Sequence, residues 1–139
     1  MEEHVRVSVT TRSIYDGGED LLVFNGSGLL KRTADGWRLR YSAKGEDGSP
    51  SASDIELCGH RAAVRNITGG YTLQLDPTQQ TLAQIPTAAG TLHMTVMTEQ
   101  LIWALEGEAS GDINMHYKLL AQQQQILSDL HVSIHLINK

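Results

Sequence analysis

The chain has 139 residues, a formal net charge of −5 and a pI of about 5.6, which argues against nucleic acid or an anionic membrane as its main partner. Its length suits one domain over residues 1–139, Cys58 excludes an internal disulfide, and no apolar run approaches the roughly 18 residues of a membrane helix. Because Met1 to His4 lacks the features of a secretory signal, we expect a cytoplasmic protein.

The N-terminal third alternates apolar and polar residues with the period of a β-strand. Val5, Val7 and Val9 alternate with polar residues, which predicts a first strand. For residues 20–32 we favour one strand kinked by glycines over a hairpin, because Ala34-Asp35-Gly36 is the better turn. The next strand then carries Trp37, Leu39, Tyr41 and Ala43 on one face.

Short strands continue through the middle of the chain. A polar loop over residues 45–51 precedes a strand with Ile55 and Leu57 on one face, and Gly59 turns the chain into a strand over 61–67. Residues 71–75 follow a Gly-Gly turn. A run over 81–85 ends at Pro86, which requires a sheet edge, a bulge or a strand end.

Three long alternating runs occupy residues 91–139. In the first, the alternation slips: Leu92, Met94 and Val96 hold even positions, whereas Leu101, Trp103 and Leu105 hold odd ones. One face stays buried only if a bulge lies near residues 98–100, and we expect all six residues on that buried face. A straight strand of this length would reach roughly 50 Å, so it must coil around a core.

These patterns predict an all-β fold of about ten strands, closed into a single antiparallel meander barrel. The residues Gln122 to Gln125 are interpreted as the last hairpin loop.

Several residue groups resemble a known family. They are the run Thr87 to Thr98, Gly111-Asp112-Ile113 and Tyr117, together with Gly28, Tyr41 and Arg65. Over nearly the whole chain these residues are similar to the uncharacterised bacterial YwiB-like proteins. The resemblance implies a calycin-like β-barrel and carries no activity with it.

Candidate chemistry is sparse. His116 is expected opposite the strand that carries His131, so a cross-strand metal pair is conceivable, but His131 and His135 lie about 13 Å apart and cannot share an ion. Asp54 with Glu56 is interpreted as a solvated face, and Cys58 beside His60 as a structural cysteine at a turn. We therefore expect no metal, no cofactor and no catalytic residues, and we favour a non-enzymatic role.

Two non-enzymatic functions fit the predicted barrel. The first is binding of a small apolar or amphipathic ligand, as in lipocalins, with Trp37, Tyr41, Trp103 and Tyr117 pointing inward. The same aromatic residues would equally serve to fill the barrel. The alternative is a protein-interaction or regulatory domain that uses the outer surface, with Met97, Ile102 and Leu120 exposed.

The orientation of Arg65 stays open at this stage. If Ala62 and Val64 face inward, Arg65 is solvated; if the other face is inward, Arg65 points into the barrel and requires an anionic partner. We hypothesise the inward case, with an acidic group of the ligand bound near Arg65.

Overall fold

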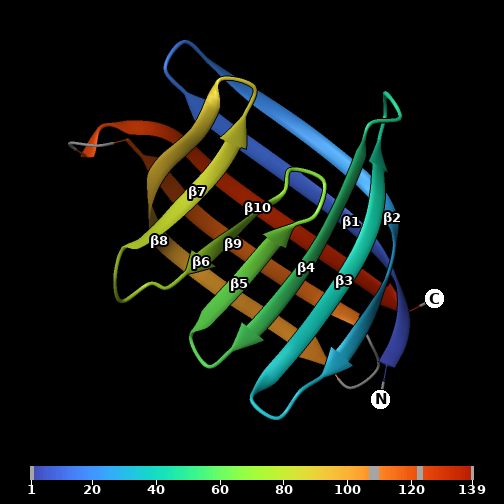
Figure 1. The fold of residues 1–139 in the computed structure, drawn as a ribbon. Coiled ribbons are helices and arrows are strands. Elements are labelled where there is room, and N and C mark those ends of the chain that lie inside the picture. The colour runs from blue at the N-terminus through green and yellow to red at the C-terminus, as the bar shows by residue number, and fades with distance from the viewer. Residues whose placement is uncertain (1, 107–109, 122–123, 139) are drawn as a thin grey trace.

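The computed structural model describes residues 2–106, 110–121 and 124–138, and ten strands contain most of them (Figure 1). Among these residues no helix is long and apolar enough to cross a membrane. The strands are β1 (Glu2–Tyr15), β2 (Gly18–Arg32), β3 (Gly36–Gly45), β4 (Pro50–Cys58), β5 (Arg61–Asn66), β6 (Tyr71–Leu75), β7 (Thr81–Thr87), β8 (Gly90–Glu106), β9 (Ser110–Leu120) and β10 (Ile126–Asn138).

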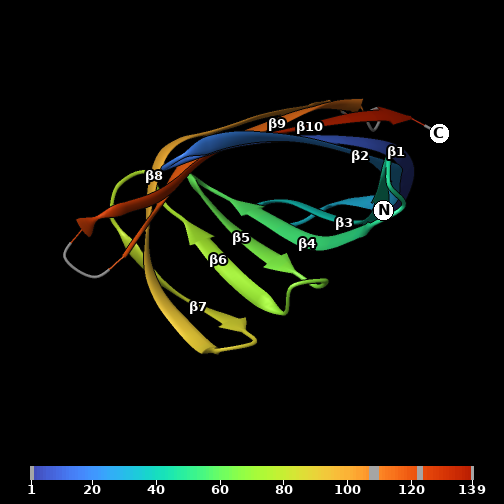
Figure 2. The ribbon, with the colours of Figure 1, turned by 90° about the horizontal axis from the view of Figure 1, so that it is seen from above.

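All ten strands belong to one antiparallel sheet with the order β6-β5-β4-β3-β2-β1-β10-β9-β8-β7. Strands β1 and β10 pair along the middle of the sheet, and β6 and β7 form its two edges. The sheet folds over on itself, with β8 curving from the layer of β9 and β10 round to β7 (Figure 2). The predicted all-β antiparallel barrel of about ten strands is confirmed, and it is nearly closed.

The seam of the barrel lies between β6 and β7, which share no backbone ladder in the described residues. Hydrogen bonds that involve side chains cross the seam instead, one from the residue after β6 to β8 and one from β7 to β6. The backbone N–H of Asp76 donates to Thr98 Oγ1 at 3.0 Å, and the hydroxyl of Thr81 donates to the carbonyl oxygen of Gln74.

The core is formed by the inward residues of the alternating strands. Val5, Val7 and Val9 of β1 are buried. They belong to the same interior core as the buried residues Leu39, Tyr41 and Ala43 of β3. Because consecutive residues of a strand point to opposite faces, the polar residues between them lie on the outside. The two-residue period in the sequence therefore predicts this core correctly.

Strand β2 is one continuous strand and not a hairpin, as predicted. Its Gly26 lies against β3, where an added Cβ would overlap the carbonyl oxygen of Ser42 and the Cα of Ala43. The glycine allows the two backbones to approach closely where the sheet bends.

Strand β8 contains the predicted bulge, because its pairing with β9 shifts register between Thr98 and Gln100. Val96 is fully buried, and Leu101, Trp103 and Leu105 are half-buried against the core. The prediction for Leu92 is wrong, since it is 47% exposed. Leu92 lies near the β7–β8 turn, which projects from the other strands (Figure 2), so no second wall covers it.

Candidate functional site

The barrel interior contains a cavity of about 420 Å³ that is partly open to solvent. Its wall is mostly apolar, with a few hydroxyl and amide groups. The lining residues are Val9, Thr11, Leu22, Phe24, Tyr41, Pro50, Ser51, Ser53, Ile55, Val64, Asn66, Thr68, Gly69, Tyr71, Leu73, Met115, Tyr117, Leu130 and Val132. This volume lies in the range of roughly 300–1,000 Å³ that is usual for small-molecule sites.

The cavity reaches the surface at one rim. Thr68 and Gly69 of the β5–β6 turn are exposed there, and so is Pro50 at the start of β4. Leu22 also lines the cavity, yet it is 51% exposed. Strand β3 ends at Gly45, opposite Phe24, and therefore leaves Leu22 without a neighbour from that strand. An apolar lip of this kind suits the entry of an apolar molecule.

Three tyrosines contribute to the lining of the cavity. Burial raises the pKa of the Tyr117 hydroxyl above its usual value, and the nearby Tyr71 and Tyr41 add to the rise. Burial also raises the pKa of Tyr41, although the hydroxyls of Ser53 and Ser51 partly offset the effect. Both phenols are therefore neutral near pH 7 and can donate or accept a hydrogen bond.

The three hydroxyl groups differ in their hydrogen bonding. The Tyr71 hydroxyl accepts a hydrogen bond of 3.0 Å from Asn66 Nδ2. Within the described residues no hydrogen bond joins the Tyr117 hydroxyl, and no fully buried side-chain oxygen or nitrogen lacks a partner, so this hydroxyl borders the open space of the cavity. Tyr117 therefore retains a donor and an acceptor for a molecule in the cavity.

No Lys, Arg, His, Asp or Glu occurs among the residues that line the cavity. A charged group inside would therefore have no counter-ion and would lose its hydration. The cavity suits a molecule that is apolar over most of its surface and carries a neutral hydrogen-bonding group.

Of the four aromatic residues that the sequence suggested for the site, two line the cavity and two do not. Tyr41 and Tyr117 line the cavity. Trp37 and Trp103 lie outside its lining and pack against the core. The guanidinium of Arg32 lies 5.3 Å from the ring centre of Trp37, a cation–π contact at the start of β3.

The inward orientation hypothesised for Arg65 is wrong. Ala62 is buried, Val64 lines the cavity, and Arg65 is exposed on the outer face. In the sheet register Arg65 lies opposite Asp54 of β4, whose carboxylate carries a negative charge opposite to that of the guanidinium. The guanidinium thus keeps its hydration, which burial in an apolar barrel would remove.

The sequence analysis missed Tyr71 as a site residue. The signal was present, because Tyr71 shares one strand face with Leu73 and Leu75, both of which are buried. A tyrosine in phase with two core leucines is expected to point into the barrel.

The other candidates found in the sequence do not form a catalytic arrangement. Asp54 is bound by Arg38, whereas Glu56 is exposed. His60 lies beside Asp76, with 3.5 Å between Nε2 and Oδ1, and in the described residues no hydrogen bond joins it to Cys58. Leu120, expected on the outer surface, is only 2% exposed, whereas Ile102 is 52% exposed.

A comparison with models of protein families identifies the family of the chain. The model of a domain of unknown function, DUF1934, matches residues 7–134. The chain belongs to the DUF1934 family. No protein with a curated description matches this DUF1934 chain.

The fold has a solved counterpart. The crystal structure of the YwiB protein from Bacillus subtilis matches with a TM-score of 0.81 over 99% of this DUF1934 chain and 93% of YwiB. The two sequences are 15% identical. The resemblance to YwiB-like proteins inferred from the sequence is confirmed, and at this identity the match shows the fold.

Proposed function

We propose that the protein is a binding module that holds a small, uncharged amphipathic molecule inside the barrel. The observation that carries this proposal is the cavity of about 420 Å³ with its uncharged wall, together with the Tyr117 hydroxyl, which no other described side chain or backbone group binds. A barrel interior that served only as a core would be filled by side chains at close packing. The apolar lip at Leu22 supports access from solvent.

The polarity of the wall defines the ligand. Its apolar part would lie against residues such as Ile55, Met115 and Val132, and its polar group would meet Tyr117 and Tyr41. A hydroxyl, a carbonyl or a neutral amide can pair with a phenol. An ionised carboxylate lacks a cation in this cavity, so the acidic ligand suggested by the sequence gives way to a neutral one.

A matched series of ligands tests this preference. Decan-1-ol, decanamide and decanoate share one chain and differ in the head group. We expect the alcohol and the amide to raise the melting temperature of the protein and to appear as one-to-one complexes in native mass spectrometry. Decanoate at pH 8 is expected to give neither signal, because its charge has no partner in the wall.

A conservative variant tests whether the ligand binds in the cavity. Tyr117→Phe removes the hydroxyl and keeps the ring, so the affinity for decanamide should fall about three- to tenfold, as for the loss of one hydrogen bond. Tyr15→Phe makes the same change at a tyrosine that is 39% exposed and outside the cavity lining, and it should bind like the wild type. Equal binding of decanoate and decanamide, or no binding of either neutral ligand, would contradict the proposal.

A further inference from the structure

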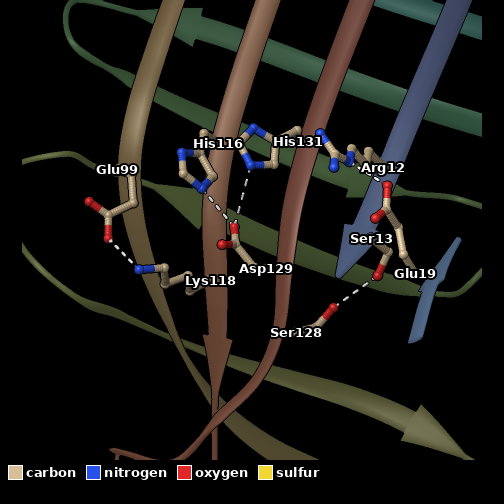
Figure 3. A network of polar contacts seen from close by, with 9 residues as sticks. All are labelled: Arg12, Ser13, Glu19, Glu99, His116, Lys118, Ser128, Asp129 and His131. Atoms are coloured by element: carbon tan, nitrogen blue, oxygen red, sulfur yellow. Dashed lines mark hydrogen bonds and ion pairs between the residues drawn. The ribbon is translucent and has the colours of Figure 1, made fainter. Parts of the chain in front are cut away.

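Two histidines face each other across β9 and β10 on the outer side of the barrel. His116 and His131 are register partners in the antiparallel ladder. Their rings are stacked, with centroids 3.8 Å apart and an angle of 19° between the planes. Asp129 lies two residues before His131 on the same face of β10 (Figure 3).

The ring nitrogens of both histidines point to one carboxylate oxygen. Asp129 Oδ1 lies 2.6 Å from His116 Nε2 and 3.7 Å from His131 Nε2 (Figure 3). The three potential ligand atoms all lie within 4.8 Å of one another. Two imidazole nitrogens and one carboxylate oxygen form a donor set that zinc and similar ions prefer.

Side-chain rotations would adapt this set to a metal ion, and they would have to open the stack of the two rings, because an imidazole nitrogen binds a metal in the plane of its ring. Ligand atoms of a tetrahedral zinc site lie about 3.3 Å apart, because each metal–ligand bond is about 2.0 Å. One of the two distances to Asp129 Oδ1 would lengthen and the other would shorten, each by less than about 1 Å. The strands that carry the residues already hold them in register.

The neighbouring cationic side chains form ion pairs with carboxylates other than that of Asp129. Lys118 lies opposite Asp129 in the sheet, but its Nζ is 3.3 Å from Glu99 Oε1. Arg12 lies opposite His131, and its Nε is 2.5 Å from Glu19 Oε1. Each cation thus has its own carboxylate, and the described ion pairs of Asp129 are those with His116 and His131.

Two bulges flank the cluster. The β8 bulge places Gln100 opposite His116, and a second bulge, between Ile126 and Ser128, precedes Asp129 in β10. A hollow of about 130 Å³ beside the two histidines is lined by Gln100, Asn114, Met115, His116, His131, Val132 and Ser133. Bulges commonly redirect side chains next to functional sites. The hollow lies on the side of Asn114 and Ser133, whereas Asp129 lies on the other side of the histidine pair.

We propose that His116, Asp129 and His131 bind one divalent transition-metal ion, with Zn²⁺ as the representative and the fourth position left to water. Mg²⁺ and Ca²⁺ are not expected to bind, because they require mainly oxygen ligands. The site lies on the outer side of the wall, so it is separate from the cavity.

Titration calorimetry with ZnCl₂ tests the proposal on the full chain, prepared without a histidine tag and treated with a chelator. We expect one Zn²⁺ per chain in the wild type and no heat with Mg²⁺. His131→Asn and Asp129→Asn should each weaken binding at least about tenfold, since the loss of an outer-shell partner alone costs 10–100-fold. Co²⁺ in place of Zn²⁺ should give the visible absorption of a tetrahedral complex.

The chain offers a matched control. His135 and Asp112 form another histidine–aspartate pair on the same two strands, with 2.7 Å between Nδ1 and Oδ1, but no second histidine joins them within the described residues. His135→Asn should therefore leave zinc binding unchanged. Equal binding by His131→Asn and the wild type, or a greater loss in His135→Asn, would overturn the proposal.

A measurement on the wild type keeps the proposal testable if a variant fails to fold. Zinc should shift the imidazole NMR signals of His116 and His131 and leave that of His135 in place. Shifts at His135 alone, or at none of the three, would overturn the proposal.

Discussion

Arg38 holds Asp54 by two hydrogen bonds on the outer face of the barrel. Nε donates to Oδ1 at 3.0 Å and Nη2 donates to Oδ2 at 2.7 Å. The Asp54 side chain is only 10% exposed, whereas that of Arg38 is 39% exposed. The hydrogen bonds from Arg38 outweigh the burial of the carboxylate and lower its pKa.

We expect Arg38→Met to lower the free energy of unfolding by about 1–2 kcal/mol, because it leaves a nearly buried carboxylate without its partner. The exposure of Arg38 keeps the figure below that of a fully buried pair. Urea denaturation measures the loss, and Lys44→Met provides the control, because the exposed Lys44 lies on the same outer face of β3 and opposite Pro50. The double variant with Asp54→Asn should lose less than the sum of the two single losses.

Asp76 gives a pH-dependent prediction. Its carboxylate accepts hydrogen bonds from the hydroxyl and backbone N–H of Thr78 and from Gln79 Nε2, which lower its pKa to about 2. In the unfolded chain the value is about 3.9. The carboxylate therefore stabilises the fold fully above the unfolded pKa, and this contribution is lost as the pH falls from about 4 to about 2.

Urea denaturation of the wild type and Asp76→Asn at several pH values tests this. The wild type should be the more stable at pH 7, and the difference should shrink below about pH 4. A difference at pH 3 as large as that at pH 7 would show that the hydrogen bonds of Asp76 do not depend on its charge.

The seam of the barrel provides a third prediction. Thr98→Val keeps the shape of the side chain but leaves the buried N–H of Asp76 without an acceptor. The free energy of unfolding should fall by about 1–3 kcal/mol, and the Asp76 amide should exchange faster with solvent. Thr95→Val is the control on β8, because the Thr95 hydroxyl makes no hydrogen bond within the described residues. Equal stability of the two variants would mean that this bond does not hold the seam.

Trp103 tests the register beyond the β8 bulge. Because Trp103 is half-buried against the core, Trp103→Ala should cost about 2–3 kcal/mol, which is less than for a fully enclosed tryptophan. The neighbouring Ile102 is 52% exposed, and Ile102→Ala should cost less than about 1 kcal/mol. If Ile102→Ala lowered the stability more than Trp103→Ala in chemical denaturation, the face of β8 that carries Ile102 would point inward, and the register would be wrong.

The sequence predicted those parts of the fold in which apolar and polar residues alternate clearly. Leu39, Tyr41 and Ala43 were assigned to the core correctly, and the change of phase in β8 located its bulge. The orientation of β5 was not decided, because Ala62 and Val64 on one face compete with Ala63 on the other. The register with β4, which brings Arg65 opposite Asp54, decides it in the structure.

The candidate sites required information that one strand does not carry. The sequence indicated that His116 and His131 lie on neighbouring strands, but not that Asp129 joins them. That contact depends on the β9–β10 register and on the bulge just before Asp129. Likewise, the cavity is lined by residues of β1 to β6, β9 and β10, and no pattern within one strand shows that these positions meet around one space.

The pairing of β1 with β10 places the two end strands side by side, with Val5 opposite Asn138, while the break in the sheet falls between β6 and β7 (Figure 1). A circular permutant that links β10 to β1 by a short loop and begins at β7 would have its strands in the same order along the chain as across the sheet. Every ladder would then join consecutive strands, and the most distant pairing of the present chain would become a local hairpin. Since folding rates rise as contacts become more local, this permutant should fold faster than the parent into the same barrel.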